Sequence, residues 1–132
     1  MASAGTDGWP HVSVVSPAVE GELLWIATRA SSGKAGNIRV NPRVALVWQP
    51  GAEIYVWGRA SWVEEDGEKQ RLWESGVFPF DLAGFFGTWA HPGFIFIKVE
   101  PVSALVLSQG TEGLSRRRWR RSGAEGPAGL EA

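Results

Sequence analysis

The chain has 132 residues, of which 44% are hydrophobic and 20% are charged, and a formal net charge of −1. This length and composition suit a single domain with a packed core. The chain holds no cysteine and two histidines, which excludes disulfides and thiol catalysis and argues against a histidine-rich metal site. No apolar stretch is long enough to cross a membrane, and the start lacks the apolar region of a signal peptide. We therefore expect a cytoplasmic protein without a membrane partner.

Short apolar runs in the first half of the chain predict β-strands separated by tight turns. An Asp7-Gly8 turn precedes residues 11–16, whose alternating pattern is typical of a strand. Residues 22–28 and 43–49 are rich in branched and aromatic side chains and are bounded by turn formers, as buried strands are. These runs indicate a mainly β protein.

Between the second and third of these strands, the sequence predicts one short helix. Ser31 or Ser32 can cap its start, and Pro42 ends it. The free N–H groups and the positive dipole end of a helix start attract anions, Gly33 lets a ligand approach the backbone, and Lys34 adds a full charge. A phosphate would fit there. An ordinary capped helix with a solvated lysine explains the same residues, and both interpretations stay open.

The middle of the chain predicts one long strand and a second helix. Residues 53–64 alternate over the longest stretch, and Gly58 inside it indicates a bulge or a close approach by another backbone. Asp66 is typical of a helix cap, and residues 67–75 place Leu72 and Trp73 toward the core.

The last third predicts an aromatic segment, two strands and a tail. Residues 77–92 are irregular but too apolar for a free linker, so we expect them to pack on the domain. Two strands follow at residues 94–100 and 103–107. The composition then predicts a domain over residues 1–109 and a disordered basic tail over residues 110–132. The body shows no basic face, so we expect no nucleic-acid partner.

The order of these elements resembles the pyridoxamine 5′-phosphate oxidase-like, FMN-binding split-barrel superfamily, and within it the general-stress-protein branch. The resemblance covers roughly residues 5–108. Its sharpest part lies within residues 28–46, which contain Ser32-Gly33-Lys34-Ala35, Asn37-Ile38 and Asn41-Pro42-Arg43-Val44. The weaker matches are Gly58-Arg59-Ala60, the Leu72-Trp73 helix and residues 96–101.

The resemblance implies a split β-barrel of six to seven antiparallel strands in a Greek-key-like order, with one or two short helices inserted. It also implies a homodimer with FMN sites at its interface and a small-molecule substrate of unknown identity. The flavin phosphate would be held by Ser31, Ser32 and Lys34. The flavin ring would lie along His11, Val12, Ser13, Val14, Ala27 and Thr28. The residues alone assign no catalytic acid or base and no metal ligand.

Many members of this superfamily carry a basic residue before the lysine, where this chain has Gly33, and Arg29 or Arg39 is a candidate substitute. The leading hypothesis is an FMN-dependent oxidoreductase, with the deazaflavin F420 as the alternative cofactor. A cofactor-free dimer that serves as an interaction or ligand-binding module is a third hypothesis. A haem protein with His11 or His91 as axial ligand is a fourth.

Overall fold

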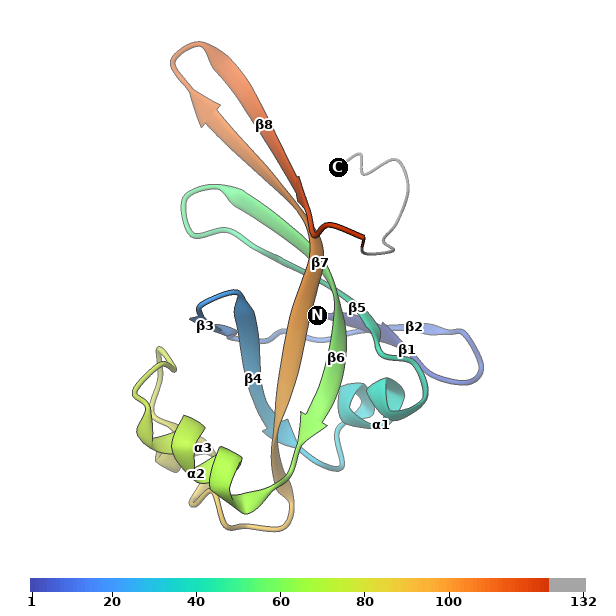
Figure 1. The fold of residues 1–132 in the computed structure, drawn as a ribbon, viewed down its shortest axis with the longest axis vertical. Helices are drawn as coiled ribbons and strands as arrows, with labels where there is room; N and C mark the ends of the chain where they lie inside the picture. Colours follow the sequence, from blue (N-terminus) through green and yellow to red (C-terminus); the bar gives the residue numbers. More distant parts are fainter. Residues whose placement is uncertain (124–132) are drawn as a thin grey trace.

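The structure, a computed structural model, describes residues 1–123. Within this part of the chain, eight antiparallel strands form one sheet in the order β2-β1-β5-β6-β7-β4-β3, and β8 pairs with β7 beside that path (Figure 1). The strands are β1 (Ala2–Ala4), β2 (Pro10–Val12), β3 (Ala18–Glu20), β4 (Leu23–Arg29), β5 (Arg43–Trp48), β6 (Glu53–Val63), β7 (Phe94–Gly110) and β8 (Gly113–Arg120). The helices inserted between them are α1 (Gly33–Val40), α2 (Asp66–Glu74) and α3 (Leu82–Phe86).

The sheet is built around β7, which spans 17 residues. β6 pairs along one edge of β7, while β4 pairs with its first half and β8 with its second half on the other edge. The sequence predicted two separate strands here, with Pro101 between them. That prediction is wrong, because β7 continues through the proline.

A bulge in the β6–β7 ladder accommodates Pro101. The pairing shifts register between Trp57 and Gly58, so that Gly58 lies opposite Pro101 while Trp57 lies opposite Ser103. Proline has no N–H to donate to a ladder, and a bulge is one of the places in a sheet that tolerate it. A Cβ added to Gly58 would lie 2.8 Å from the carbonyl oxygen of Glu100, so only glycine fits. The bulge predicted at Gly58 is confirmed.

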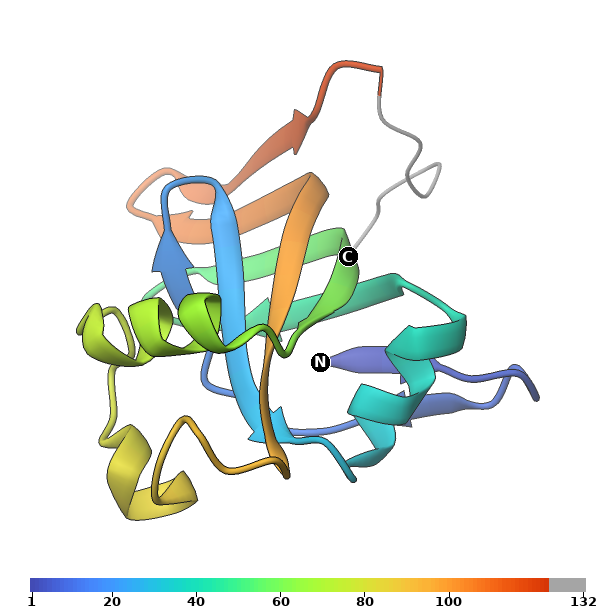
Figure 2. The same ribbon diagram turned by 60° about the horizontal axis from the view of Figure 1, so that its bottom comes forward.

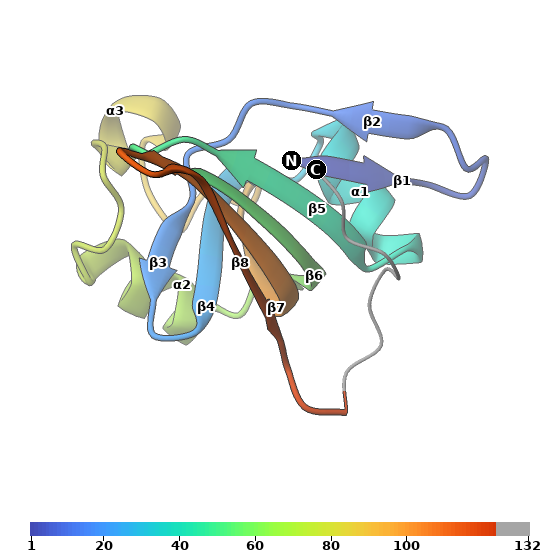
Figure 3. The same cartoon turned by 90° about the horizontal axis from the view of Figure 1, so that it is seen from above.

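The second half of β7 pairs with a strand that the sequence analysis placed in a disordered tail. β8 pairs with β7 from Ser103 opposite Arg120 to Gly110 opposite Gly113, and the hairpin projects at the top of Figure 1. Seen from above, β8 lies along β7 (Figure 3). The expected disorder is therefore wrong for residues 110–123, and residues 124–132 lie outside the described part. The open edge of β7 supplies the backbone partners that an isolated polar segment lacks.

Two further elements differ from the sequence prediction. β3 was not predicted, and it pairs with β4 through residues 18–20. The strand predicted over residues 11–16 is shorter, since β2 ends at Val12. Together with β8 and the continuous β7, these changes give eight strands within the described residues where six to seven were expected.

Two apolar clusters lie on opposite faces of β4 and β7. The inner cluster joins β4, β5, β6 and β7 to α1 through side chains that include Ile26, Ile38 and Ile97. The outer cluster joins β4 and β7 to α2 and α3 through Trp25, Leu72 and Phe96, among others. Figure 2 shows α2 crossing the face of β4, with α1 on the other side beside β1 and β2. The aromatic segment at 77–92 packs on the domain as predicted.

Candidate functional site

The start of α1 has the neutral cap that the sequence predicted. Ser32 is the N-cap, and its Oγ accepts a hydrogen bond from the Ala35 N–H at 3.3 Å. The same Oγ accepts from the buried Thr28 hydroxyl at 3.2 Å, so β4 fixes the position of the cap. A hydroxyl that accepts twice still has its own proton to donate. Ser31, the other predicted cap, is exposed and lies just before the helix.

Lys34 stands beside an open hollow of about 230 Å³ next to this helix start. Apolar and aromatic side chains form most of its wall. The lining residues are Val14, Val15, Ser16, Ala27, Lys34, Phe80, Phe85 and Phe86. Partial burial removes water from the Lys34 ammonium and lowers its pKa from 10.5. A bound anion would offset that loss of hydration.

His11 in β2 and Ser13 just after it each carry a buried polar atom, Nδ1 and Oγ, that has no hydrogen-bond partner within the described residues. The backbone N–H of Ser13 donates to the Met1 carbonyl at 3.0 Å, which continues the β1–β2 pairing. Val12 and Val14 project outward, with 79% and 98% of their surface exposed. Exposed valines beside unsatisfied polar atoms are features of a surface that a ligand or another chain covers.

The structure brings some of the predicted site residues together and leaves others apart. Val14, Ala27 and Lys34 line the hollow. Thr28 and Ser32 meet through their hydroxyls at the helix start. His11 lies against the first residue of α1. Val12, Ser13 and Ser31 are not among the residues that line the hollow.

Sequence reasoning missed five lining residues: Val15, Ser16, Phe80, Phe85 and Phe86. The density of phenylalanines after α2 was a signal of packing, but nothing local showed that three of them would face Lys34. That proximity depends on the long-range pairing of β4 with β7, which carries the aromatic segment toward residue 27.

Arg29 and Arg39, the candidates to replace the basic residue missing at position 33, lie at different distances from the hollow. Arg39 lies in the last turn of α1, donates to Glu64 at 3.0 Å and stacks over Trp62 at 3.6 Å. It is therefore engaged at the end of the helix opposite Ser32. Arg29 lies over the ring of Phe86 at 6.0 Å, next to the hollow.

Among residues 1–123, no group of three or more histidine, cysteine, aspartate or glutamate side chains is placed to hold a metal ion. None of the helices in this range has the length and apolar character needed to span a bilayer.

A family model described as "Pyridoxamine 5'-phosphate oxidase" matches residues 1–81, which is more than half of the chain. The chain belongs to this family. The resemblance inferred from the sequence is thereby confirmed. No curated protein matches the chain.

Solved structures of the same fold agree with this assignment. General Stress Protein 26 from Bacillus anthracis str. Sterne is 22% identical with a TM-score of 0.67, over 91% of this chain and 85% of that chain. A pyridoxamine 5′-phosphate oxidase-related, FMN-binding protein from Nostoc punctiforme is 18% identical with a TM-score of 0.67, over 92% and 79%. An F420 reductase is 23% identical with a TM-score of 0.58, over 78% and 84%. The predicted split-barrel fold is confirmed.

Proposed function

We propose that the protein binds FMN at the start of α1 and acts as an oxidoreductase on a small molecule. One observation carries the proposal: the half-buried Lys34, in the first turn of a helix with a neutral cap, lines an aromatic hollow. This pairs a place for a phosphate with a place for a flat apolar ring. The name of the Nostoc punctiforme neighbour as an FMN-binding protein supports the choice of flavin.

The phosphate end of the ligand would meet Ser32, Lys34 and the free N–H groups of the first helical turn. Helix starts bind phosphate because their N–H groups and dipole both favour negative charge. The Ser32 hydroxyl donates its remaining proton, and Lys34 supplies the charge. Ser31, which precedes the cap residue, would be a peripheral ligand of the phosphate.

The ring end would lie over Ala27 and the segment formed by Val12, Ser13 and Val14, with the phenylalanines of the hollow beside it. When bound, a flavin supplies the transfer of a hydride or electron pair, while the protein supplies binding and orientation. Of these residues, Val14 and Ala27 line the hollow, while the buried Ser13 hydroxyl does not.

A homodimer belongs to the same proposal. The hollow of about 230 Å³ is below the roughly 300–1,000 Å³ of ordinary cofactor sites, so one chain alone would leave the ligand partly uncovered. Val14 and Phe85 line the hollow and are 98% and 65% exposed, which suits contact with a second copy. We place this dimer in the cytoplasm.

F420 is the second candidate cofactor, favoured by the neighbour named as an F420 reductase. Both cofactors carry a phosphate and a flat tricyclic ring, and the start of α1 does not distinguish them. The third hypothesis, a dimer without cofactor, is the conclusion if neither ligand binds.

A visible absorbance titration of the purified protein with FMN tests the proposal. We expect a protein-dependent shift of the flavin band that is strongly weakened in Lys34→Ala. Lys98→Ala is the matched control, because Lys98 lies on β7 and pairs with Glu100 at 3.3 Å. An unchanged spectrum with excess FMN would refute the FMN assignment, and the same titration with F420 then decides between the remaining hypotheses.

A further inference from the structure

The imidazole of His11 lies against the first residue of α1. A Cβ added to Gly33 would lie 3.0 Å from His11 Nε2, 3.4 Å from Cδ2 and 3.5 Å from Cε1. The three nearest heavy atoms around that position therefore all belong to one ring. Glycine at residue 33 adds no side chain to the helix start and leaves room for the histidine of β2 to stand there instead.

The surroundings of the ring favour one tautomer. His11 Nδ1 is buried and has no hydrogen-bond partner within the described residues. A buried N–H without an acceptor costs more than a bare ring nitrogen, so the proton of a neutral imidazole is better placed on Nε2. Nε2 is the nitrogen that faces Gly33. The donor thus points to the start of α1, next to Ser32 and Lys34 in the chain.

We propose that the Nε2–H of His11 donates a hydrogen bond to the phosphate bound at the start of α1. This inference rests on the proposed function and gives His11 a phosphate role, in place of the contact with the flavin ring that the family resemblance implied. The phosphate would then be bound from two sides, by Ser32 and Lys34 at the start of α1 and by His11 of β2.

Comparing FMN with riboflavin isolates the phosphate, since the two ligands share the ring and differ at the phosphate. His11→Phe keeps an aromatic ring but has no hydrogen-bond donor. In this variant we expect FMN affinity to fall about tenfold to hundredfold, because that is the usual effect of losing a hydrogen bond to a charged group. Riboflavin affinity should not change, which also shows that the variant is folded. His11→Gln, whose amide nitrogen can reach the position of Nε2, should keep most of the FMN affinity.

Gly33→Ala provides a second, independent variant. Its methyl group would lie 3.0 Å from Nε2 and forces the imidazole to shift, so we expect a smaller, few-fold loss for FMN and none for riboflavin. Gly36→Ala is the matched control on the same helix, because a Cβ there meets no atom within 4 Å. In His11→Phe the added Gly33→Ala change should bring no further loss.

The outcomes separate this inference from the proposed function. If the wild-type protein does not bind FMN, both are overturned. If it binds FMN and Lys34→Ala loses the preference over riboflavin while His11→Phe keeps it, only the role of His11 is overturned. Equal losses of FMN and riboflavin in His11→Phe also overturn it, because they place the imidazole at the ring.

Discussion

The helices α1 and α2 are of similar length, eight and nine residues, yet their first turns differ in charge. At α2 the cap is Glu65, whose carboxylate accepts from the N–H groups of Gly67 and Glu68 at 2.8 Å each. Asp66 and Glu68 add two further acids to the first turn. At α1 the cap is a serine, and the first turn contains no acid. Among the described residues, acidic side chains occupy the start of α2 and none occupies the start of α1.

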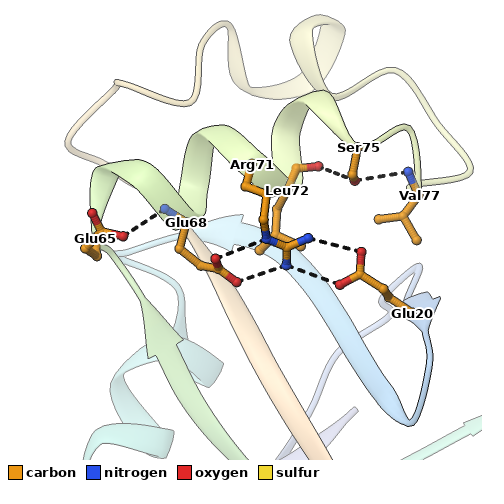
Figure 4. Close-up of polar contacts among 7 residues, drawn as sticks. All are labelled: Glu20, Glu65, Glu68, Arg71, Leu72, Ser75 and Val77. Carbon is orange, nitrogen blue, oxygen red and sulfur yellow. Dashed lines mark hydrogen bonds and ion pairs between the residues drawn. The ribbon is translucent and has the colours of Figure 1, made fainter.

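One acid in the first turn of α2, Glu68, is also neutralised within the chain. Arg71 donates to Glu68 and to Glu20 of β3, with nitrogen–oxygen distances of 3.0–3.2 Å (Figure 4). These contacts hold the pKa of Glu68 below its usual range and raise the pKa of Arg71. Within residues 1–123, no equivalent carboxylate pairs with Lys34, whose pKa is lowered by burial. The two helix starts have the same backbone chemistry. Carboxylates of the chain itself satisfy the start of α2, whereas the start of α1 and the charge of Lys34 are left for a ligand.

The largest effect is expected from giving α1 the kind of cap that α2 has. In Ser32→Asp the carboxylate still accepts from Ala35 and Thr28, so the helix persists, but it repels a phosphate. We expect FMN affinity to fall about hundredfold, or ~3 kcal/mol, from the lost hydroxyl donor and the added charge. Fluorescence titration with FMN and riboflavin measures it. Ser32→Asn, which provides a neutral cap, should keep the preference for FMN over riboflavin. An unchanged FMN affinity in Ser32→Asp would contradict the binding of a phosphate at this site.

A smaller effect is expected from pH. Bound phosphate favours the charged form of Lys34 and raises its lowered pKa. At a pH between the pKa values of Lys34 in the ligand-free and the FMN-bound protein, binding therefore takes up a proton. FMN affinity should then decrease as pH rises through the ligand-free pKa, by up to about tenfold per pH unit. Dissociation constants measured from about pH 7 to about pH 10 test this. Riboflavin should show no such slope, and a parallel slope for both ligands would assign the effect to the ring.

Removing the cap of α2 should affect stability and leave the flavin site unchanged. Glu65→Ala leaves the N–H groups of Gly67 and Glu68 without their partner, and we expect a loss of about 1 kcal/mol in the free energy of unfolding. Urea denaturation measures this loss. Glu65→Ser should restore most of it. A change in FMN affinity in Glu65→Ala would show that the starts of α1 and α2 are coupled and do not act independently.

The smallest effect concerns Arg71, whose side chain is 46% exposed. Arg71→Ala should lower the free energy of unfolding by about 0.5 kcal/mol, because exposed ion pairs are screened by water. The pKa of Glu68 is lower in the folded state than in the unfolded state. The stabilisation is therefore fully present above the unfolded-state pKa of about 4.5 and is lost as pH falls through the folded-state pKa. Denaturation at neutral and acidic pH tests the sign, with Arg43→Ala, an exposed arginine of β5, as the control.

Local signals in the sequence were enough for the elements whose cause is local. Ser32 caps α1, because a serine oxygen satisfies the first-turn N–H groups wherever the helix lies. Gly58 marks the bulge, because the ladder demands a residue without a side chain there. The cap of α2 was predicted one residue late, at Asp66, since neighbouring acids offer the same oxygen and only the backbone geometry selects Glu65.

The sequence by itself determined the helix start, the bulge and the order of elements that identifies the family. Tertiary structure alone decided that residues 113–120 become β8, because the polar segment gains its partners only from the open edge of β7. It also decided that His11 faces Gly33 and that phenylalanines of the segment after α2 stand beside Lys34. These contacts join residues far apart in the chain, and no local propensity encodes a distance that depends on how the whole sheet is paired.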